Sequence, residues 1–179
     1  MSHLKRSVST TKLKAMRKKE LQNAAKILHI EDMRILRLPD AGVKKHSQQI
    51  FQKGLAYAKK IQPEVVLSFG PHGISGHYDH ITVGVQAKKI AKKVGARFYA
   101  VILPPNVAKN ALAYFRTRRS AGHYASDISF QKLSIRVSID PKVEKRAIRA
   151  HLLAFLISQC VNYLKLNILL DSMFILKEV

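Results

Sequence analysis

The stretch Ser68-Phe69-Gly70-Pro71-His72-Gly73-Ile74-Ser75-Gly76-His77-Tyr78-Asp79-His80 decides the fold of this 179-residue chain. It closes an apolar run over residues 64–69, of the kind that forms a buried parallel strand. A helical pattern over residues 81–94 follows it. Ligands of open α/β sheets bind at the carboxyl ends of the strands. We therefore expect chemistry at this loop, which combines glycines, histidines and an aspartate.

Helices and strands alternate on both sides of the loop. The apolar spacing predicts helices over 11–29, 44–61, 106–119 and 142–160, and strands over 33–38, 97–103 and, at a sheet edge, 133–139. This alternation predicts an α/β fold, Rossmann-like, with a mainly parallel sheet and helices on both faces. Because a helix comes first along the chain, we expect the first βα unit of such a sheet to be missing.

The composition is that of a single folded domain over residues 1–179. Apolar residues make up 47% of the chain, which is enough for a hydrophobic core. Residues 1–10 form a basic lead-in that we expect to be flexible, and residues 163–179 form an apolar C-terminal tail of ambiguous secondary structure. No uncharged apolar run is long enough to predict a transmembrane segment. The single cysteine, Cys160, excludes an internal disulfide and indicates a reducing compartment, the cytoplasm.

The chain is strongly basic, with 32 Lys and Arg against 11 Asp and Glu, for a net charge of +21. Such a charge attracts anions, including nucleic acid. One hypothesis is therefore a non-catalytic basic α/β domain that binds anions or nucleic acid. The aromatic residues are scattered and include no tryptophan, so a solvated basic surface is favoured over a base-stacking platform.

His77, Asp79 and His80 are the candidate catalytic or metal-binding group. Two histidines three residues apart can face the same way on a helical turn, as metal ligands do. An aspartate between them can accept a ring N–H and fix a tautomer. The alternative is a polar loop with exposed histidines, in which Asp79 caps the following helix. The residues alone leave both interpretations open.

Two candidates lie outside the loop. Arg17 is one helical turn from Glu20, a spacing that also suits a solvated ion pair worth a few tenths of a kcal/mol. Asp40 directly follows a predicted strand. It either faces the same crevice as the loop or caps the next helix.

The motif Pro71-His72-Gly73-x-x-Gly76-His77-x-Asp79-His80 resembles the second signature of the LmbE-like (PIG-L) deacetylases. These are zinc-dependent hydrolases that remove acetyl groups from N-acetylglucosamine-type sugars. The upstream sequence is similar too: Arg17-x-x-Glu20-Leu21-x-x-Ala24-Ala25-x-x-Leu28, Leu38-Pro39-Asp40 and Gln62-Pro63-Glu64-Val65-Val66 follow the family's order. The resemblance is good over residues 13–105 and loose elsewhere.

The resemblance implies a role for each candidate residue. His80 would be a zinc ligand, and His77 would assist the tetrahedral intermediate or protonate the leaving amine. Asp79 would orient a histidine. Arg17 and Asp40 would contact the sugar or its phosphate-bearing aglycone. Zinc and an N-acetylated amino-sugar conjugate are thus the implied cofactor and substrate.

The sequence also departs from the family pattern. It contains no His-Pro-Asp-Asp-Glu-type motif, which in the family supplies two zinc ligands and the general base. Tyr78 stands where the family usually has proline. We therefore expect a family member without its N-terminal unit, through truncation, a late start codon or decay, with one incomplete zinc site and impaired activity.

Overall fold

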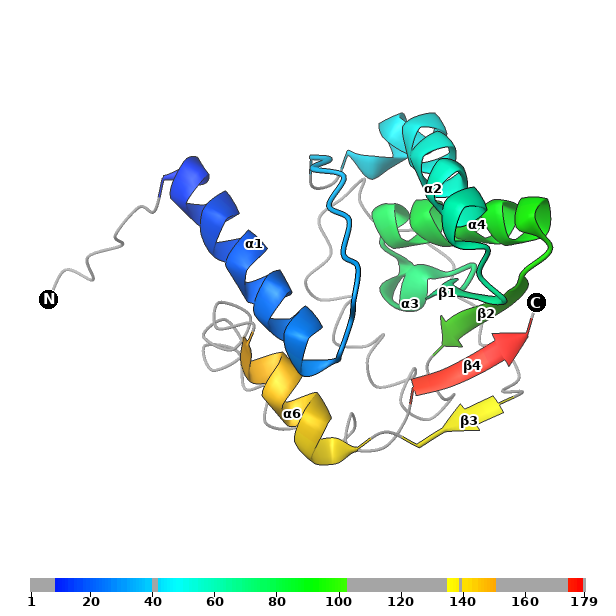
Figure 1. Cartoon of the computed structure of the whole chain (residues 1–179). Helices are drawn as coiled ribbons and strands as arrows, with labels where there is room; N and C mark the ends of the chain where they lie inside the picture. Colours follow the sequence, from blue (N-terminus) through cyan, green and yellow to red (C-terminus); the bar gives the residue numbers. More distant parts are fainter. Residues whose placement is uncertain (1–8, 40–41, 103–134, 139, 151–173, 179) are drawn as a thin grey trace, which may run out of the picture. The chain divides into compact units, whose positions relative to one another are not determined.

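The computed structural model describes residues 9–39, 42–102, 135–138, 140–150 and 174–178 (Figure 1). By their contacts the residues fall into two compact units. Unit 1 comprises Met1–Ile35 and Ile139–Ser172, and unit 2 comprises Leu36–Ser138 and Met173–Val179. The expectation of a single domain stays a prediction.

Unit 1 contains the helices α1 (Thr10–Ile27) and α6 (Pro141–Ala150), which pack against each other. The Ser9 hydroxyl caps α1 by accepting a hydrogen bond from the Lys12 N–H at 3.3 Å. The packed positions carry small side chains, with Ala24, Ala25 and Ala147 buried. The helix predicted over 11–29 is confirmed. The helix predicted over 142–160 is confirmed as far as Ala150, and its remainder lies outside the described residues, as does the one predicted over 106–119.

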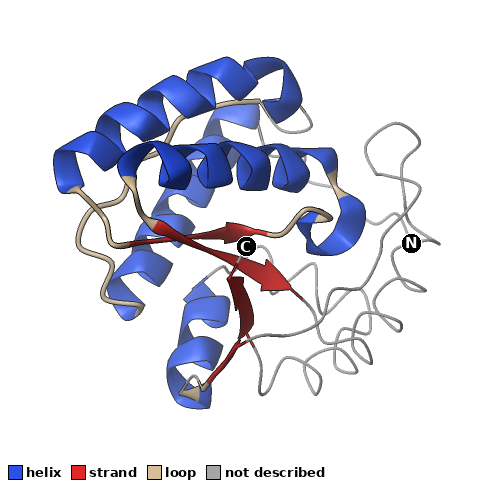
Figure 2. Ribbon diagram, turned by 90° about the vertical axis from the view of Figure 1, so that its right-hand side faces the viewer, coloured by secondary structure: helices blue, strands red, loops and turns tan. Residues whose placement is uncertain are grey.

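Unit 2 contains a four-stranded sheet in the order β1-β2-β4-β3. Figure 2 draws the strands in red, with helices stacked over them. Its strands are β1 (Val65–Phe69), β2 (Arg97–Ile102), β3 (Ile135–Val137) and β4 (Phe174–Glu178). β1 and β2 are parallel, as expected, whereas β4 pairs antiparallel with both β2 and β3. The α/β fold class is confirmed. β3 lies at an edge of the described sheet, as predicted, and the ambiguous apolar tail supplies β4.

The helices of unit 2 build a layer over the parallel strand pair. They are η1 (Val43–His46), α2 (Ser47–Ile61), α3 (Gly73–Gly76) and α4 (Tyr78–Val94). α4 connects β1 to β2 and packs on both strands, and α2 packs against α4 (Figure 1). The core between helix and sheet is formed by Ala91, Phe98 and Ala100, which are fully or almost fully buried. The strand predicted over 97–103 is confirmed, and so is the helix predicted over 81–94, which ends at the C-cap residue Gly95.

The strand predicted over residues 33–38 is wrong, because these described residues form no strand. A strand needs a neighbour to bond its backbone groups, and the described sheet gives this segment no ladder partner. Arg37 also has a φ of 56°, which breaks the extended conformation. The helix predicted over 44–61 is confirmed, with its first turn a 3₁₀ turn, η1.

Gly84 lets the backbone of α4 come into contact with the backbone at the end of β1. A Cβ at this position would lie 2.4 Å from the Phe69 carbonyl oxygen and 3.4 Å from that of Gly70. Neither oxygen can rotate away, because both belong to the main chain at the end of β1. The helix can therefore sit at this depth only with glycine at position 84.

We predict that Gly84→Ala destabilises the protein by about 1–3 kcal/mol, the usual cost of overpacking. Alanine has the better helix propensity by about 1 kcal/mol, but the clash with a carbonyl oxygen outweighs it. Gly54→Ala on α2 is the matched control. Its Cβ would meet only the mobile end of the Ile90 side chain, at 2.6 Å, so we expect little loss. Urea unfolding of both variants checks this, and equal stability of the two would contradict the predicted role of Gly84.

Candidate functional site

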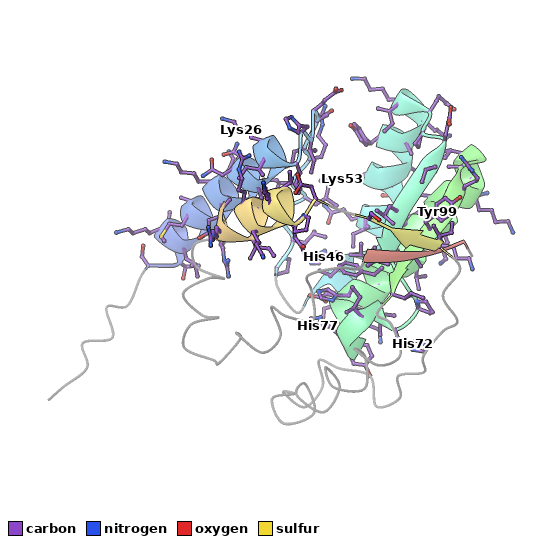
Figure 3. The ribbon with its side chains drawn as sticks, turned by 90° about the horizontal axis from the view of Figure 1, so that it is seen from below. Lys26, His46, Lys53, His72, His77 and Tyr99 are labelled. Carbon is purple, nitrogen blue, oxygen red and sulfur yellow. The ribbon has the colours of Figure 1, made fainter. Side chains whose placement is uncertain are left out.

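A tight turn joins the carboxyl end of β1 to α4. The Gly70 N–H still bonds to the β2 strand at the Val101 carbonyl oxygen (3.3 Å), and the Gly73 N–H then bonds back to Gly70 (2.9 Å). Ile74 has φ 65° and ψ −57°, a conformation that a β-branched residue rarely adopts and that costs of order 1–3 kcal/mol. The turn carries His72 and His77, both labelled in Figure 3. Strained backbone of this kind clusters at functional sites.

His80, on the first turn of α4, is oriented by the backbone of this turn. Its Nδ1 lies 3.1 Å from the Gly73 carbonyl oxygen. A carbonyl only accepts hydrogen bonds, so Nδ1 is the donor and the neutral ring keeps its lone pair on Nε2. A Cβ on Gly73 would lie 2.8 Å from the His80 Cβ, so glycine is needed for this approach. Nε2 of His80 is therefore a basic nitrogen suited to binding a metal or accepting a proton.

Phe69 supports the same ring from the end of β1. The Phe69 and His80 rings stack with centroids 4.4 Å apart and planes within 4° of parallel. A stacked aromatic pair is worth about 0.5–1.5 kcal/mol beyond the area it buries. The hydrogen bond and the stack together restrict both the tilt and the rotation of the imidazole.

His77 has the opposite hydrogen-bonding polarity. It is the N-cap residue of α4, and its Nδ1 accepts a hydrogen bond from the Asp79 N–H at 3.1 Å. Nδ1 is therefore unprotonated, and a neutral His77 ring carries its hydrogen on Nε2. The His77 and His80 ring centroids are 5.2 Å apart. The turn thus places an N–H donor and a lone-pair nitrogen side by side.

The Asp79 carboxylate forms a hydrogen bond with a different element, η1. The residue is 8% exposed, and its Oδ1 accepts a hydrogen bond from the Val43 N–H of η1 at 3.1 Å. The idea that Asp79 caps α4 is wrong, since His77 is the cap. Asp79 reaches His77 through its backbone N–H, and orientation of a histidine by the carboxylate itself stays a prediction.

Tyr78, at the position where the resemblance leads one to expect proline, adds a contact to η1. The Lys44 Nζ lies 5.3 Å from the centroid of the Tyr78 ring. A cation–π contact at this distance is worth about 0.5–1 kcal/mol at an exposed site. It holds a positive charge beside the histidine turn.

Two candidates belong to other parts of the chain, Arg17 to unit 1 and Asp40 to the residues that the structure does not describe. Arg17 belongs to unit 1, where its Nη1 pairs with the Glu20 Oε2 at 3.1 Å. The Glu20 side chain is 8% exposed and that of Arg17 is 45% exposed, so the pair neutralises a buried carboxylate and is more than a solvated ion pair. Asp40 lies outside the described residues. Contact of either residue with substrate stays a prediction.

Among the described residues, His80 fits the role of a zinc ligand, but these residues do not form a complete zinc site. The His80 ring has the tautomer of a metal ligand, with Nδ1 bonded to a backbone carbonyl, as ligating histidines usually have. A catalytic zinc takes about three protein ligands. Within the described part of the chain, no group of three His, Cys, Asp or Glu side chains could hold a metal ion.

Three features of the site were missed from the sequence. They are the stacking of Phe69 on His80, the Val43 N–H that binds Asp79, and the Gly73 carbonyl that binds His80. The apolar run over residues 64–69 indicated a strand but could not indicate which ring would stack on Phe69. The glycines of the loop gave no sign that the carbonyl of one of them would bind an imidazole.

The parallel strand pair, its crossover helix and the histidine turn define an α/β protein with an imidazole site at the carboxyl end of a strand. The chain belongs to the PIG-L family, because residues 1–91 match the family model described as PIG-L: GlcNAc-PI de-N-acetylase. The LmbE-like resemblance is thereby confirmed.

Other comparisons are more distant. The chain is similar to the crystal structure of the zinc-inhibited form of teicoplanin deacetylase Orf2, with 13% sequence identity and a TM-score of 0.46. That similarity covers 76% of this chain and 58% of the deacetylase chain. No curated protein sequence matches the chain. Among the described helices, none has the length and apolar character needed to cross a membrane.

We predict that His77→Ala destabilises the protein by about 1 kcal/mol, the usual cost of losing an N-cap. His77→Asn is the matched control, because asparagine is a strong N-cap residue whose side-chain oxygen can replace Nδ1. Urea unfolding should therefore show a loss of stability for the alanine variant and near-native stability for the asparagine variant. Native stability of both would show that the His77 ring does not cap α4.

Proposed function

We propose that this protein is a zinc-dependent deacetylase that removes the acetyl group from an N-acetylglucosamine-type sugar conjugate. Membership of the PIG-L family supports this reaction class. The observation that carries the proposal is the opposite polarity of the two imidazoles, with Nε2 of His80 as a lone-pair nitrogen and Nε2 of His77 as an N–H donor. Amide hydrolysis needs a lone-pair nitrogen that binds the metal or accepts a proton, and it needs an N–H group that donates a hydrogen bond.

The proposed roles follow from these tautomers. His80 would hold zinc through Nε2, and the chemistry that zinc would supply there is a lowered pKa of bound water and a polarised carbonyl. His77 donates a hydrogen bond from Nε2 to the acyl oxygen, where negative charge develops in the tetrahedral intermediate. Protonation of the leaving amine as the C–N bond breaks requires the imidazolium form of His77, in which the Asp79 N–H bond to Nδ1 is given up. Water supplies the oxygen of the released acetate. Arg17 and Asp40 are proposed to contact the sugar or its phosphate-bearing aglycone.

The proposed activity of the 179-residue chain is low. The sequence holds no His-Pro-Asp-Asp motif, and the described residues provide one ligand, where catalytic zinc takes about three. Affinity for zinc then depends on ligands other than those described. The cytoplasm is the proposed compartment, since a single cysteine suits a reducing environment. The nucleic-acid alternative stays a prediction that no comparison supports.

We predict that His80→Ala weakens zinc binding by at least about tenfold, since even a residue that only supports a ligand contributes that much. His72→Ala is the matched control, because it removes an imidazole from the same turn that is not assigned as a ligand. Zinc titration by calorimetry and acetate release from an N-acetylglucosaminyl conjugate measure the two consequences. Whatever acetate release the intact chain shows should be retained by His72→Ala and lost in His80→Ala.

Two outcomes would contradict the proposal. One is equal zinc affinity of the intact chain and His80→Ala, which would remove His80 as a ligand. The other is acetate release that is unaffected by His80→Ala, which would place the chemistry elsewhere.

A further inference from the structure

We propose that the Asp79 carboxylate is a positioning group that holds η1 against the histidine turn, so that η1 forms one wall of the site. The catalytic meaning of this inference rests on the proposed function, whereas the contact itself does not. Asp79 is 8% exposed, and its Oδ1 accepts the Val43 N–H at 3.1 Å across 36 positions of sequence. A buried carboxylate needs such a partner.

The bond caps η1 from another element. Val43 is the first residue of η1, and the preceding Gly42 has no side chain to satisfy its first N–H groups. The first N–H groups of a helical segment lack internal partners, and a negative charge there is favourable. Asp79 supplies the acceptor for the first of these N–H groups.

A second contact joins η1 to the first turn of α4. Lys44 follows Val43 and lies over the ring of Tyr78, which precedes Asp79. Two consecutive residues of η1 thus contact two consecutive residues of α4. This pairing positions η1 relative to α4 along both elements.

The arrangement makes Asp79 a connection between two parts of the site. Its N–H is bonded to Nδ1 of His77, and its carboxylate is bonded to Val43. A shift of η1 would therefore act on the residue that orients His77.

This role differs from one that depends on the charge of Asp79. A tether requires an oxygen acceptor, which asparagine retains in the same place. Orientation of a histidine by a carboxylate requires the negative charge of Asp79, which Asp79→Asn removes. Asp79→Asn and Asp79→Ala therefore separate the two roles.

The test is amide hydrogen exchange of the full chain, followed by NMR. We expect Val43 to exchange at a near-native rate in Asp79→Asn and at least about tenfold faster in Asp79→Ala, because its hydrogen bond is lost. Phe98 and Ala100, in the core of β2, should be unchanged in both variants and so show that the fold is intact. The ¹⁵N shifts of His77 should report the same tautomer in both, since the backbone N–H of residue 79 remains.

A reciprocal variant removes the donor in place of the acceptor. Val43→Pro deletes the N–H. Proline suits the first position of a helical segment, and Gly42 before it, whose ψ is 0°, has no Cβ to clash with the proline ring. We expect Val43→Pro to accelerate exchange at Lys45 and His46, and Asp79→Ala to add nothing further in that background. If Asp79→Ala fails to fold, the Asn variant and Val43→Pro still decide the question.

Two results would overturn the inference: native exchange at Val43 in Asp79→Ala, or exchange in Asp79→Asn as fast as in the alanine variant. Neither readout needs zinc or substrate. A chain that releases no acetate but loses Val43 protection in Asp79→Ala would refute the proposed function and retain the tether.

Discussion

The site depends on the contact between the backbone of α4 and the end of β1. At Gly84 the helix comes so near to the Phe69 carbonyl oxygen that a methyl group would not fit. This close approach of helix to strand places the first turn of α4 beside Phe69, the last residue of β1. The ring of Phe69 can then stack on that of His80. A helix held farther out would leave both rings without this contact and would open the turn between them.

Backbone groups set the chemistry of the turn. The Gly73 carbonyl makes Nδ1 of His80 a donor, and the Asp79 N–H makes Nδ1 of His77 an acceptor. The same type of side chain is thereby given two opposite hydrogen-bonding characters within four residues. The strained conformation of Ile74 is consistent with a turn whose shape is determined by these contacts and not by its own backbone preferences.

Much of the fold was predictable because it depends on local pattern. The apolar run of β1 and the helical spacing of α4 predicted both elements, and the motif predicted that His77, Asp79 and His80 lie together. The failures depend on tertiary contacts. Residues 33–38 have the apolar pattern of a strand, but a strand forms only beside a partner, and the described sheet offers none. The partner of Asp79 is 36 residues away in sequence, a distance at which spacing carries no signal.

The polarity of the two imidazoles also bears on how a metal would bind. The hydrogen bonds that set the Nδ1 polarity of both rings come from backbone atoms of the stretch between Gly73 and His80, and Phe69 adds its stack on the His80 ring. A metal that approached Nε2 of His80 would meet a ring already in the required tautomer and would lose little further rotamer freedom on binding. The number of other ligands would then govern affinity, while the acid and ligand characters of the two histidines would stay the same. Orientation of the imidazoles and completeness of the metal site are therefore separate properties of this chain, and the described residues provide the first without the second.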